Sequence, residues 1–176
     1  MNVLGEGRFV RLIERDTYEF VERIGCTGII SVVALTAENE MIFVEQYRHP
    51  VDGRTIELVA GLVGDHGEES LETAVRRELL EEAGYEAQDL QFLLECPSAG
   101  GITAARVNYF LARDVVRVND GGGVDDEDIV VHVVPVHLVH DWLQEKNGEG
   151  LLIDPKVFLG LSVALHGWNA TVTPTP

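Results

Sequence analysis

Three glutamates, Glu78, Glu81 and Glu82, stand at positions i, i+3 and i+4 of one segment. A helix places residues with this spacing on one face, so the three carboxylates lie close together. Carboxylates at such range repel one another unless they are protonated or neutralised by a cation. Because oxygen ligands favour Mg²⁺ or Mn²⁺, the spacing predicts a site for one of these ions. The alternative is a solvated face, which is the usual meaning of a glutamate-rich helix.

The residues around the glutamates favour the cation site. Segment 61–85 reads GLVGDHGEESLETAVRRELLEEAGY, in which a glycine-rich loop leads into the helix. Ser70 is a candidate N-cap, and Gly84 is placed to end the helix. An apolar residue recurs at every fourth position as a core-facing stripe, at Leu71, Val75 and Leu79.

This order of residues resembles the signature of the Nudix hydrolases, in which a glutamate is followed, after seven residues, by R-E-U-x-E-E-x-G-U with U apolar. The matching residues are Glu69, Arg77-Glu78-Leu79, Glu81-Glu82 and Gly84-Tyr85. Seven residues separate Gly61 from Glu69, where the family usually has five, which predicts a longer loop before an unchanged helix. Arg77 can pair with Glu69 and fix its orientation.

Further segments resemble the branch of that family that hydrolyses ADP-ribose and nucleotide sugars. These segments are VEQYRHPV, ELVAGLV, SAGG and DDEDIVVHVV. The resemblance implies that Glu78 and Glu82 bind the metal, together with the backbone carbonyl of Ala60, and that Glu81 assists. It also implies that the metal-activated water attacks a diphosphate.

Other residues are candidates for binding the substrate. The resemblance implies that Arg48, which follows V-E-Q-Y, contacts phosphate; the alternative is a surface ion pair at the end of a strand. Arg54 is a second candidate for charge-assisted bonds to the diphosphate. For stacking on a nucleobase, the candidates are Tyr18 and Phe20 in the N-terminal strands.

Two departures from the branch bear on the substrate and the general base. The S-P-G-G of ADP-ribose hydrolases is Ser98-Ala-Gly-Gly101 here, and the usual T-S-E is Thr103-Ala-Ala105, which lacks the acid. Both leave room for a nucleotide sugar other than ADP-ribose. The resemblance then places a catalytic carboxylate in the loop 119–129, NDGGGVDDEDI, with Glu127 as first candidate for the base and Asp125 as second. The glycines favour loop motion, and the alternative is a solvated acidic turn.

The elements that must position these residues follow from alternating segments and helical stripes. Strands are expected at 9–13, 18–23, 28–35, 41–47, 90–95, 107–112 and 129–134. Helices are expected at 70–83, 136–146 and from Asp154-Pro155 onward, the last with Phe158, Leu161, Leu165 and Trp168 on its inner face. This order predicts an α+β fold, namely a Nudix-type α/β/α sandwich on a mixed sheet with N-terminal antiparallel strands.

The chain of 176 residues is expected to form one domain over 1–170, followed by a disordered tail at 171–176. The resemblance marks the N-terminal strands, 1–25, as an element of a homodimer. With 30 acidic and 13 basic residues, the formal net charge of −17 makes binding to nucleic acid or to an anionic membrane unfavourable. We expect a cytosolic protein, because neither a signal peptide nor a spanning apolar run is evident.

The sequence thus predicts hydrolysis of ADP-ribose or a related nucleoside diphosphate sugar to a nucleoside monophosphate and a sugar phosphate, with Mg²⁺ or Mn²⁺. One alternative is a Nudix-fold sensor that binds a nucleotide sugar without cutting it, which should have lost its metal glutamates. Another is a hydrolase of dinucleoside polyphosphates or damaged nucleotides, which would not need VEQYR and DDEDI. His137 and His140 have helical spacing, but the sequence offers no matching third ligand for zinc.

Overall fold

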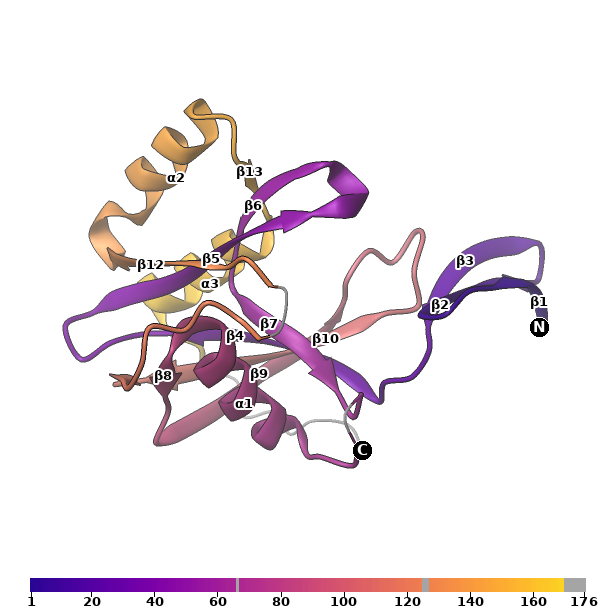
Figure 1. The fold of residues 1–176 in the computed structure, drawn as a ribbon, viewed down its shortest axis with the longest axis horizontal. Helices are drawn as coiled ribbons and strands as arrows, with labels where there is room; N and C mark the ends of the chain where they lie inside the picture. The colour runs from indigo at the N-terminus through magenta and orange to yellow at the C-terminus, as the bar shows by residue number, and fades with distance from the viewer. Residues whose placement is uncertain (66, 125–126, 170–176) are drawn as a thin grey trace.

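The computed structural model describes residues 1–65, 67–124 and 127–169 (Figure 1). Its strands are β1 (Asn2–Glu6), β2 (Val10–Arg15), β3 (Tyr18–Arg23), β4 (Gly28–Ala34), β5 (Glu40–Arg48), β6 (Gly53–Glu57), β7 (Val59–Val63), β8 (Tyr85–Glu86), β9 (Asp89–Pro97), β10 (Arg106–Arg113), β11 (Val116–Arg117), β12 (Val130–Pro135) and β13 (Leu152–Ile153). Its helices are α1 (Leu71–Ala83), α2 (Val139–Gly148) and α3 (Lys156–His166), with the 3-10 turns η1 (His49–Val51) and η2 (Val136–Leu138).

Two four-stranded sheets form the centre of the molecule, with the strand orders β7-β4-β10-β9 and β12-β5-β6-β13. Strand β10 runs parallel to β4 and β13 runs parallel to β6, while the other pairs are antiparallel. Helix α1 packs on one side of this centre, against β7 and β4, and α2 and α3 cover the other side (Figure 1). The predicted α/β/α sandwich on a mixed sheet is confirmed.

Alternating residues of the central strands build a core on each side. Along β5, Ile42 and Val44 join the core beneath α1, whereas Met41 and Phe43 join the core beneath α2 and α3. All four are fully buried. Because successive side chains of a strand point to opposite faces, one apolar run serves both layers.

Most expected elements are present, but the inner face of α3 differs from the prediction. Phe158 and Leu165 are 49% and 54% exposed, so their placement in the core is wrong. The helix instead buries Val157 and Leu161. It lies so close to the sheet at Gly160 that a Cβ there would come within 2.6 Å of a core side chain. This close approach sets the rotation of α3 and turns Phe158 outward.

Several strands are not predicted by the sequence pattern. They are β1, the two-residue strands β8, β11 and β13, and the strands β6 and β7, which lie between 53 and 63 and carry Arg54, Glu57 and Ala60. The expected tail at 171–176 lies outside the described residues.

The N-terminal strands β1, β2 and β3 form an antiparallel sheet of their own, as predicted, which extends away from the central layers (Figure 1). It is joined to the loop between β9 and β10. The amide of Val21 donates to Ile102 O at 2.8 Å, and that of Ala104 donates to Val21 O at 2.9 Å. The role of this sheet in a homodimer and the domain bounds 1–170 stay predictions.

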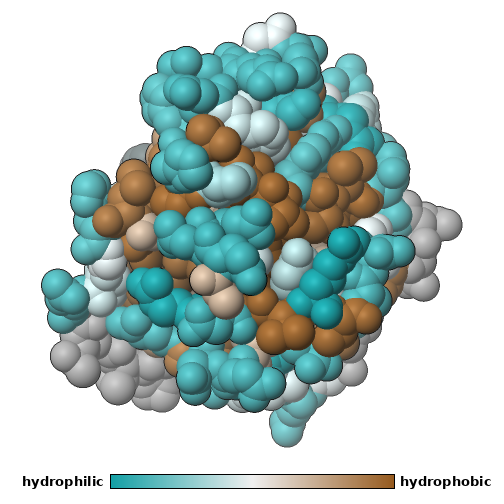
Figure 2. Space-filling model, turned by 90° about the vertical axis from the view of Figure 1, so that its left-hand side faces the viewer, coloured by the Kyte–Doolittle hydropathy of each residue, from teal (hydrophilic) through white to brown (hydrophobic). Residues whose placement is uncertain are grey.

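The surface is mainly hydrophilic on the side shown in Figure 2. Seen from the side that carries α2, hydrophilic side chains dominate and apolar patches lie between them (Figure 2). Within the described ranges, no helix is long and apolar enough to cross a membrane.

Candidate active site

Helix α1 carries the three glutamates and has the ends that the sequence predicts. The Ser70 hydroxyl accepts a hydrogen bond from the Thr73 amide at 3.1 Å, and Gly84 ends the helix in the left-handed conformation with φ of 77°. These caps satisfy backbone groups that a helix leaves without partners. Val75 and Leu79 are fully buried beneath the helix, so the predicted stripe fixes which face α1 turns to the core.

Glu78 and Glu82 are brought together where α1 crosses β7. The Glu82 carboxylate accepts a hydrogen bond from the Ala60 amide at 3.1 Å. Glu78 lies directly over Gly61, where any Cβ would overlap its carboxylate. With Glu78 in this position, only a glycine fits at residue 61. Ala60, Glu78 and Glu82, the predicted metal ligands, form one cluster.

Burial makes the two carboxylates difficult to ionise. Burial, together with the charges of Glu78 and Glu127, raises the pKa of Glu82 to about 8, although the hydrogen bond from the Ala60 amide lowers it. Burial also raises the pKa of Glu78 and outweighs the lowering effect of Arg77, and the charges of Glu81 and Glu127 add smaller increases. Two buried acids this close are stabilised as carboxylates by a bound cation.

Arg77 links the remaining acids of the signature. Its guanidinium is 2.9 Å from Glu69, 2.8 Å from Glu78 and 3.1 Å from Glu81, and it also donates to Leu62 O at 2.9 Å. The pairing of Arg77 with Glu69 is thus confirmed. Glu81 is about one-third exposed and lies on the Arg77 side of the cluster, so it is the acid most accessible from solvent.

The donor set fits a hard divalent cation. The cluster offers the carboxylate oxygens of Glu78 and Glu82 and lies against the backbone of Ala60. The absence of a side chain at Gly61 leaves the space that the Glu78 carboxylate occupies. Within residues 1–65, 67–124 and 127–169, no three His, Cys, Asp or Glu side chains are already arranged around one point as ligands. Arg77 and the Ala60 amide currently hold the carboxylates.

The loop after β11 places Glu127 near this cluster. The amides of Gly122 and Gly123 donate to Glu82 O and Glu81 O at 2.9 Å each, so the loop is docked on the end of α1. The negative charge of Glu127 contributes to the raised pKa of both Glu78 and Glu82. The Glu127 carboxylate accepts a hydrogen bond from the Val124 amide at 3.0 Å. Asp125, the second candidate for the base, lies outside the described residues.

The loop glycines are required by this docking. Gly121 has a φ of 65°, and a Cβ there would lie 2.6 Å from Glu82 O. Gly123 has a φ of 88°, and a Cβ there would lie 2.6 Å from the Glu127 carboxylate. The glycines thus allow close packing of the loop on α1, and the loop motion that they favour stays a prediction.

Arg48 lies beside the cluster, at the end of β5, and is paired with a buried acid. Its Nε and one terminal nitrogen each lie 2.7 Å from a Glu57 oxygen. Burial would raise the pKa of Glu57, but hydrogen bonds from Arg48 and Thr55 outweigh it and hold that pKa below its ordinary value. Because a guanidinium has five N–H groups, Arg48 keeps donors for a phosphate.

Arg54 is not brought together with Arg48. In the β5–β6 pair, Arg54 lies opposite Tyr47, so its side chain takes the other face of the hairpin. There it lies 2.5 Å from Glu45 and 2.8 Å from Asp128. Arg54 therefore forms an ion pair with Asp128, the residue that follows Glu127. The contact of Arg54 with a diphosphate stays a prediction.

The aromatic candidates lie on the N-terminal sheet. Tyr18 is 58% exposed, and its hydroxyl donates to Gly101 O at 3.4 Å. Phe20 lies under the Arg15 guanidinium. Tyr18 is therefore positioned at the loop between β9 and β10, next to Ile102.

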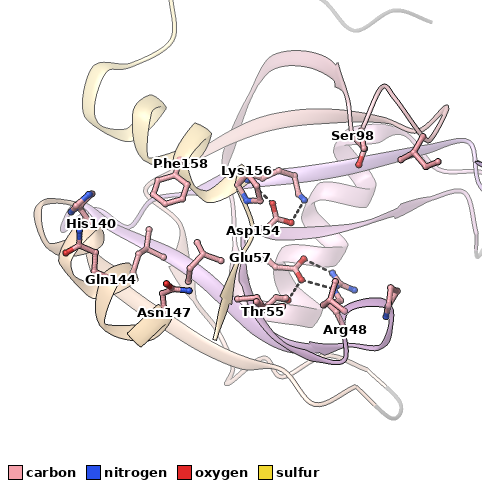
Figure 3. Close-up of a pocket in the computed structure, with 18 residues that line it drawn as sticks. Arg48, Thr55, Glu57, Ser98, His140, Gln144, Asn147, Asp154, Lys156 and Phe158 are labelled. Atoms are coloured by element: carbon pink, nitrogen blue, oxygen red, sulfur yellow. Dashed lines mark hydrogen bonds and ion pairs between the residues drawn. The ribbon is translucent and has the colours of Figure 1, made fainter. Parts of the chain in front are cut away.

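Ile102 is one of the residues that line a hollow of about 1280 Å³, which the sequence does not predict. Arg48 and Glu57 lie at one end of the hollow, and Phe158, His140 and Gln144 lie at the other (Figure 3). The segments that line it are far apart in the chain. The one signal in the sequence was Phe158, an aromatic residue assigned to the core that proves to be half-exposed.

Comparisons with known proteins agree with this geometry. Residues 28–151 match the family model described as NUDIX domain. The chain belongs to the Nudix family. The Nudix match covers β4 through α2 and so includes the glutamate cluster, Arg48 and the loop with Glu127.

Several relatives are similar to this chain over part of their length. The chain is 33% identical to the GDP-mannose pyrophosphatase of Pectobacterium atrosepticum over 144 residues, which are 76% of this chain and 70% of that protein. It is 33% identical to the ADP-ribose pyrophosphatase of Bacillus subtilis over 103 residues, which are 58% and 55% of the two chains. It is 32% identical to the methanol dehydrogenase activator of Bacillus methanolicus, also over 103 residues, and spans 55% of that protein.

A solved structure supports the Nudix fold. The structure titled "Crystal structure of ADP compounds hydrolase" superposes with a TM-score of 0.66, over 93% of this chain and 87% of that one. At 20% identity, this likeness concerns the fold alone.

Proposed function

We propose that this Nudix protein hydrolyses the diphosphate bond of a nucleoside diphosphate linked to a sugar and releases a nucleoside monophosphate and a sugar phosphate. The observation that carries the proposal is the position of Glu78 and Glu82, buried together at Ala60 and Gly61 with Arg48 beside them. Relatives named for GDP-mannose and for ADP-ribose support the class of substrate.

Glu78, Glu82 and the backbone carbonyl of Ala60 would hold a divalent cation, Mg²⁺ or Mn²⁺. When bound, such an ion lowers the pKa of water and neutralises charge on phosphate oxygens. The buried carboxylates supply the negative charge that a cation needs, and Arg77 offsets the repulsion between Glu78 and Glu81 by pairing with both. Without a cation, the net charge of the cluster would repel an anionic substrate.

Arg48 would bind the diphosphate with the N–H groups that Glu57 leaves unused. Glu57 holds the guanidinium in place through two bonds, so little side-chain freedom is lost when the substrate arrives. Glu127 is exposed and electrostatically coupled to both metal glutamates, which suits a group that takes a proton from the attacking water. Glu81 would assist from the solvent side.

The test is a substrate panel at equal concentrations, comprising ADP-ribose, ADP-glucose, GDP-mannose, a dinucleoside tetraphosphate and nucleoside triphosphates. Anion-exchange chromatography separates and quantifies each substrate of the panel and its phosphorylated products. We expect the nucleotide sugars to be cleaved with Mg²⁺ or Mn²⁺ and not in excess EDTA.

The proposal fails if triphosphates or the dinucleoside tetraphosphate react at least about tenfold faster, which is about 1.4 kcal/mol of transition-state stabilisation. It also fails if nucleotide sugars bind in calorimetry but are never cleaved with either ion, since that result indicates a sensor.

A further inference from the structure

The hollow lies directly behind the arginine proposed to bind the diphosphate. Arg48 and Glu57 form one end of it, and Asp154 and Lys156, at the start of α3, lie at its centre (Figure 3). The pKa of Arg48 is raised mainly by Glu57 and also by the charges of Glu82 and Asp154, so Arg48 lies within reach of both the metal cluster and the hollow. A group joined to a diphosphate at Arg48 can therefore extend into this space.

The hollow is large enough for a sugar ring. Its volume of about 1280 Å³ exceeds that of typical small-ligand sites, roughly 300–1,000 Å³. A ribosyl group and a hexosyl group both fit, and both leave part of this space to water. A hexosyl group, with its additional carbon and hydroxyl, makes more contacts with the walls.

The charged walls are neutralised within the protein. Arg48 is paired with Glu57, and Lys156 forms an ion pair with Asp154. Asp154 also accepts a hydrogen bond from the Lys156 amide at 2.8 Å, which fixes it at the start of α3. An uncharged ligand with many hydroxyls suits such walls better than a second phosphate does.

One face of α2 offers planar polar groups to the hollow. His140, Gln144 and Asn147 all line it, at the spacing of successive helical turns (Figure 3). In the part of the chain that the structure describes, the Gln144 amide has no hydrogen-bond partner, and Asn147 uses only its nitrogen, which donates to Leu151 O. Amides offer a donor and an acceptor side by side, which matches neighbouring hydroxyls of a sugar.

Phe158 faces these groups from α3. Its ring is 49% exposed, and Leu152, also lining the hollow, is 42% exposed. A sugar ring presents C–H groups on one face and hydroxyls around its edge. A half-exposed aromatic ring opposite a row of amides therefore matches both parts of a sugar, and covering the ring removes apolar surface from water.

We propose that the hollow binds the hexosyl group of a nucleoside diphosphate hexose, with Phe158 against the face of the sugar and Gln144 at its hydroxyls. This inference rests on the proposed function, in which Arg48 binds the diphosphate. It makes the preferred substrate a hexose nucleotide, and ADP-ribose a poorer one. The nucleobase then lies on the other side of the diphosphate, outside the hollow.

The test compares two substrates that share the same nucleotide. ADP-glucose and ADP-ribose differ only beyond the diphosphate, so the ratio of their kcat/KM values reports the sugar alone. The full chain is expected to favour ADP-glucose. Phe158→Ala and Gln144→Ala should each lower that ratio by about three- to tenfold, the effect of one aromatic contact or one hydrogen bond.

Each variant has a matched control. Leu165→Ala truncates another half-exposed apolar residue of α3, and Glu145→Ala truncates the neighbour of Gln144; neither residue lines the hollow. Both controls should keep the ratio within about twofold of the wild-type value. Because Phe158 and Gln144 are exposed, we expect all four variants to keep the wild-type melting temperature.

A second measurement needs no turnover. Calorimetry with glucose 1-phosphate, ribose 5-phosphate and AMP should show that Phe158→Ala weakens the binding of glucose 1-phosphate and leaves the binding of the other two unchanged. The inference is overturned if AMP binding is the one that weakens, which places the nucleobase in the hollow. It is also overturned if the substrate ratio is unchanged in both variants. Hydrolysis that fails with every nucleotide sugar, while glucose 1-phosphate binding still depends on Phe158, contradicts the proposed function and not the hollow.

Discussion

Replacing Arg48 with alanine separates two roles of this residue, binding the diphosphate and neutralising Glu57. The Glu57 side chain is 7% exposed and loses two bonds of 2.7 Å, keeping the Thr55 hydroxyl as its donor. Removing a partner from a fully buried ion pair costs about 3–5 kcal/mol. Because the Arg48 side chain is 42% exposed, water can reach the carboxylate, and we expect a loss of about 2 kcal/mol.

Adding Glu57→Gln distinguishes the two roles. The double variant removes the buried charge, so it should regain most of the lost stability in urea unfolding. It should not regain activity, because charge-assisted bonds to the diphosphate stay lost; we expect kcat/KM to remain about 10- to 100-fold below wild type. Recovery of wild-type kcat/KM in the double variant would refute the role of Arg48 in substrate binding.

The pH dependence provides a check on the stability effect. In the folded wild type, Arg48 holds the pKa of Glu57 below its ordinary value. A lowered carboxyl pKa stabilises the folded state above the ordinary pKa, and this contribution is lost as the pH falls through the folded pKa. The stability gap between wild type and Arg48→Ala should therefore be full at neutral pH and close in acid. Arg106→Ala, which breaks an exposed pair with Glu95, is the control and should cost at most about 1 kcal/mol at any pH.

Four further variants test the rest of the site. Glu82→Gln should abolish turnover without unfolding the protein. In EDTA, the free energy of unfolding of the wild type should fall relative to that of this variant as the pH rises from about 5 to 8. The reason is that the raised pKa of Glu82 favours the folded state only while the group is protonated. Glu127→Gln should lower kcat by about 10²–10⁴-fold with metal affinity near wild type; a loss below threefold would exclude Glu127 as the base, and the same result in Asp125→Asn would leave the loop without a base. Arg54→Ala removes the ion pair with Asp128 beside Glu127, so it should lower kcat while KM changes little. An unchanged kcat would show that this ion pair does not matter for catalysis. Gly121→Ala should lower both melting temperature and kcat, whereas Gly101→Ala, where a Cβ meets nothing within 4 Å, should change neither.

The sequence predicted the helical half of the site well, because short-range rules determine it. The spacing of Glu78, Glu81 and Glu82 fixes their common face, and Ser70 and Gly84 fix where the helix begins and ends. The apolar stripe then decides which side is buried. Each of these steps involves residues within a few positions of one another, so the bounds and the buried face of the helix depend little on tertiary contacts.

The parts that depend on long-range packing could not be predicted in the same way. Arg54 was a candidate beside Arg48, but the side on which it points follows from the pairing of β5 with β6, a strand that was not recognised. Phe158 was assigned to the core because α3 has apolar residues on several sides, and the close approach at Gly160 decides which side is buried. The hollow itself is formed by segments around 50, 100 and 150, whose meeting no local pattern encodes.

The docking of the loop on α1 has a consequence for hydrogen exchange. The amides of Gly122 and Gly123 are bonded to carbonyls of Glu82 and Glu81, so they exchange with solvent only when the loop leaves the helix. Two backbone amides thus report the opening of the loop that carries Glu127. Because the same two glutamates belong to the acidic cluster, a cation that stiffens the last turn of α1 should slow the labelling of both glycines without touching either one.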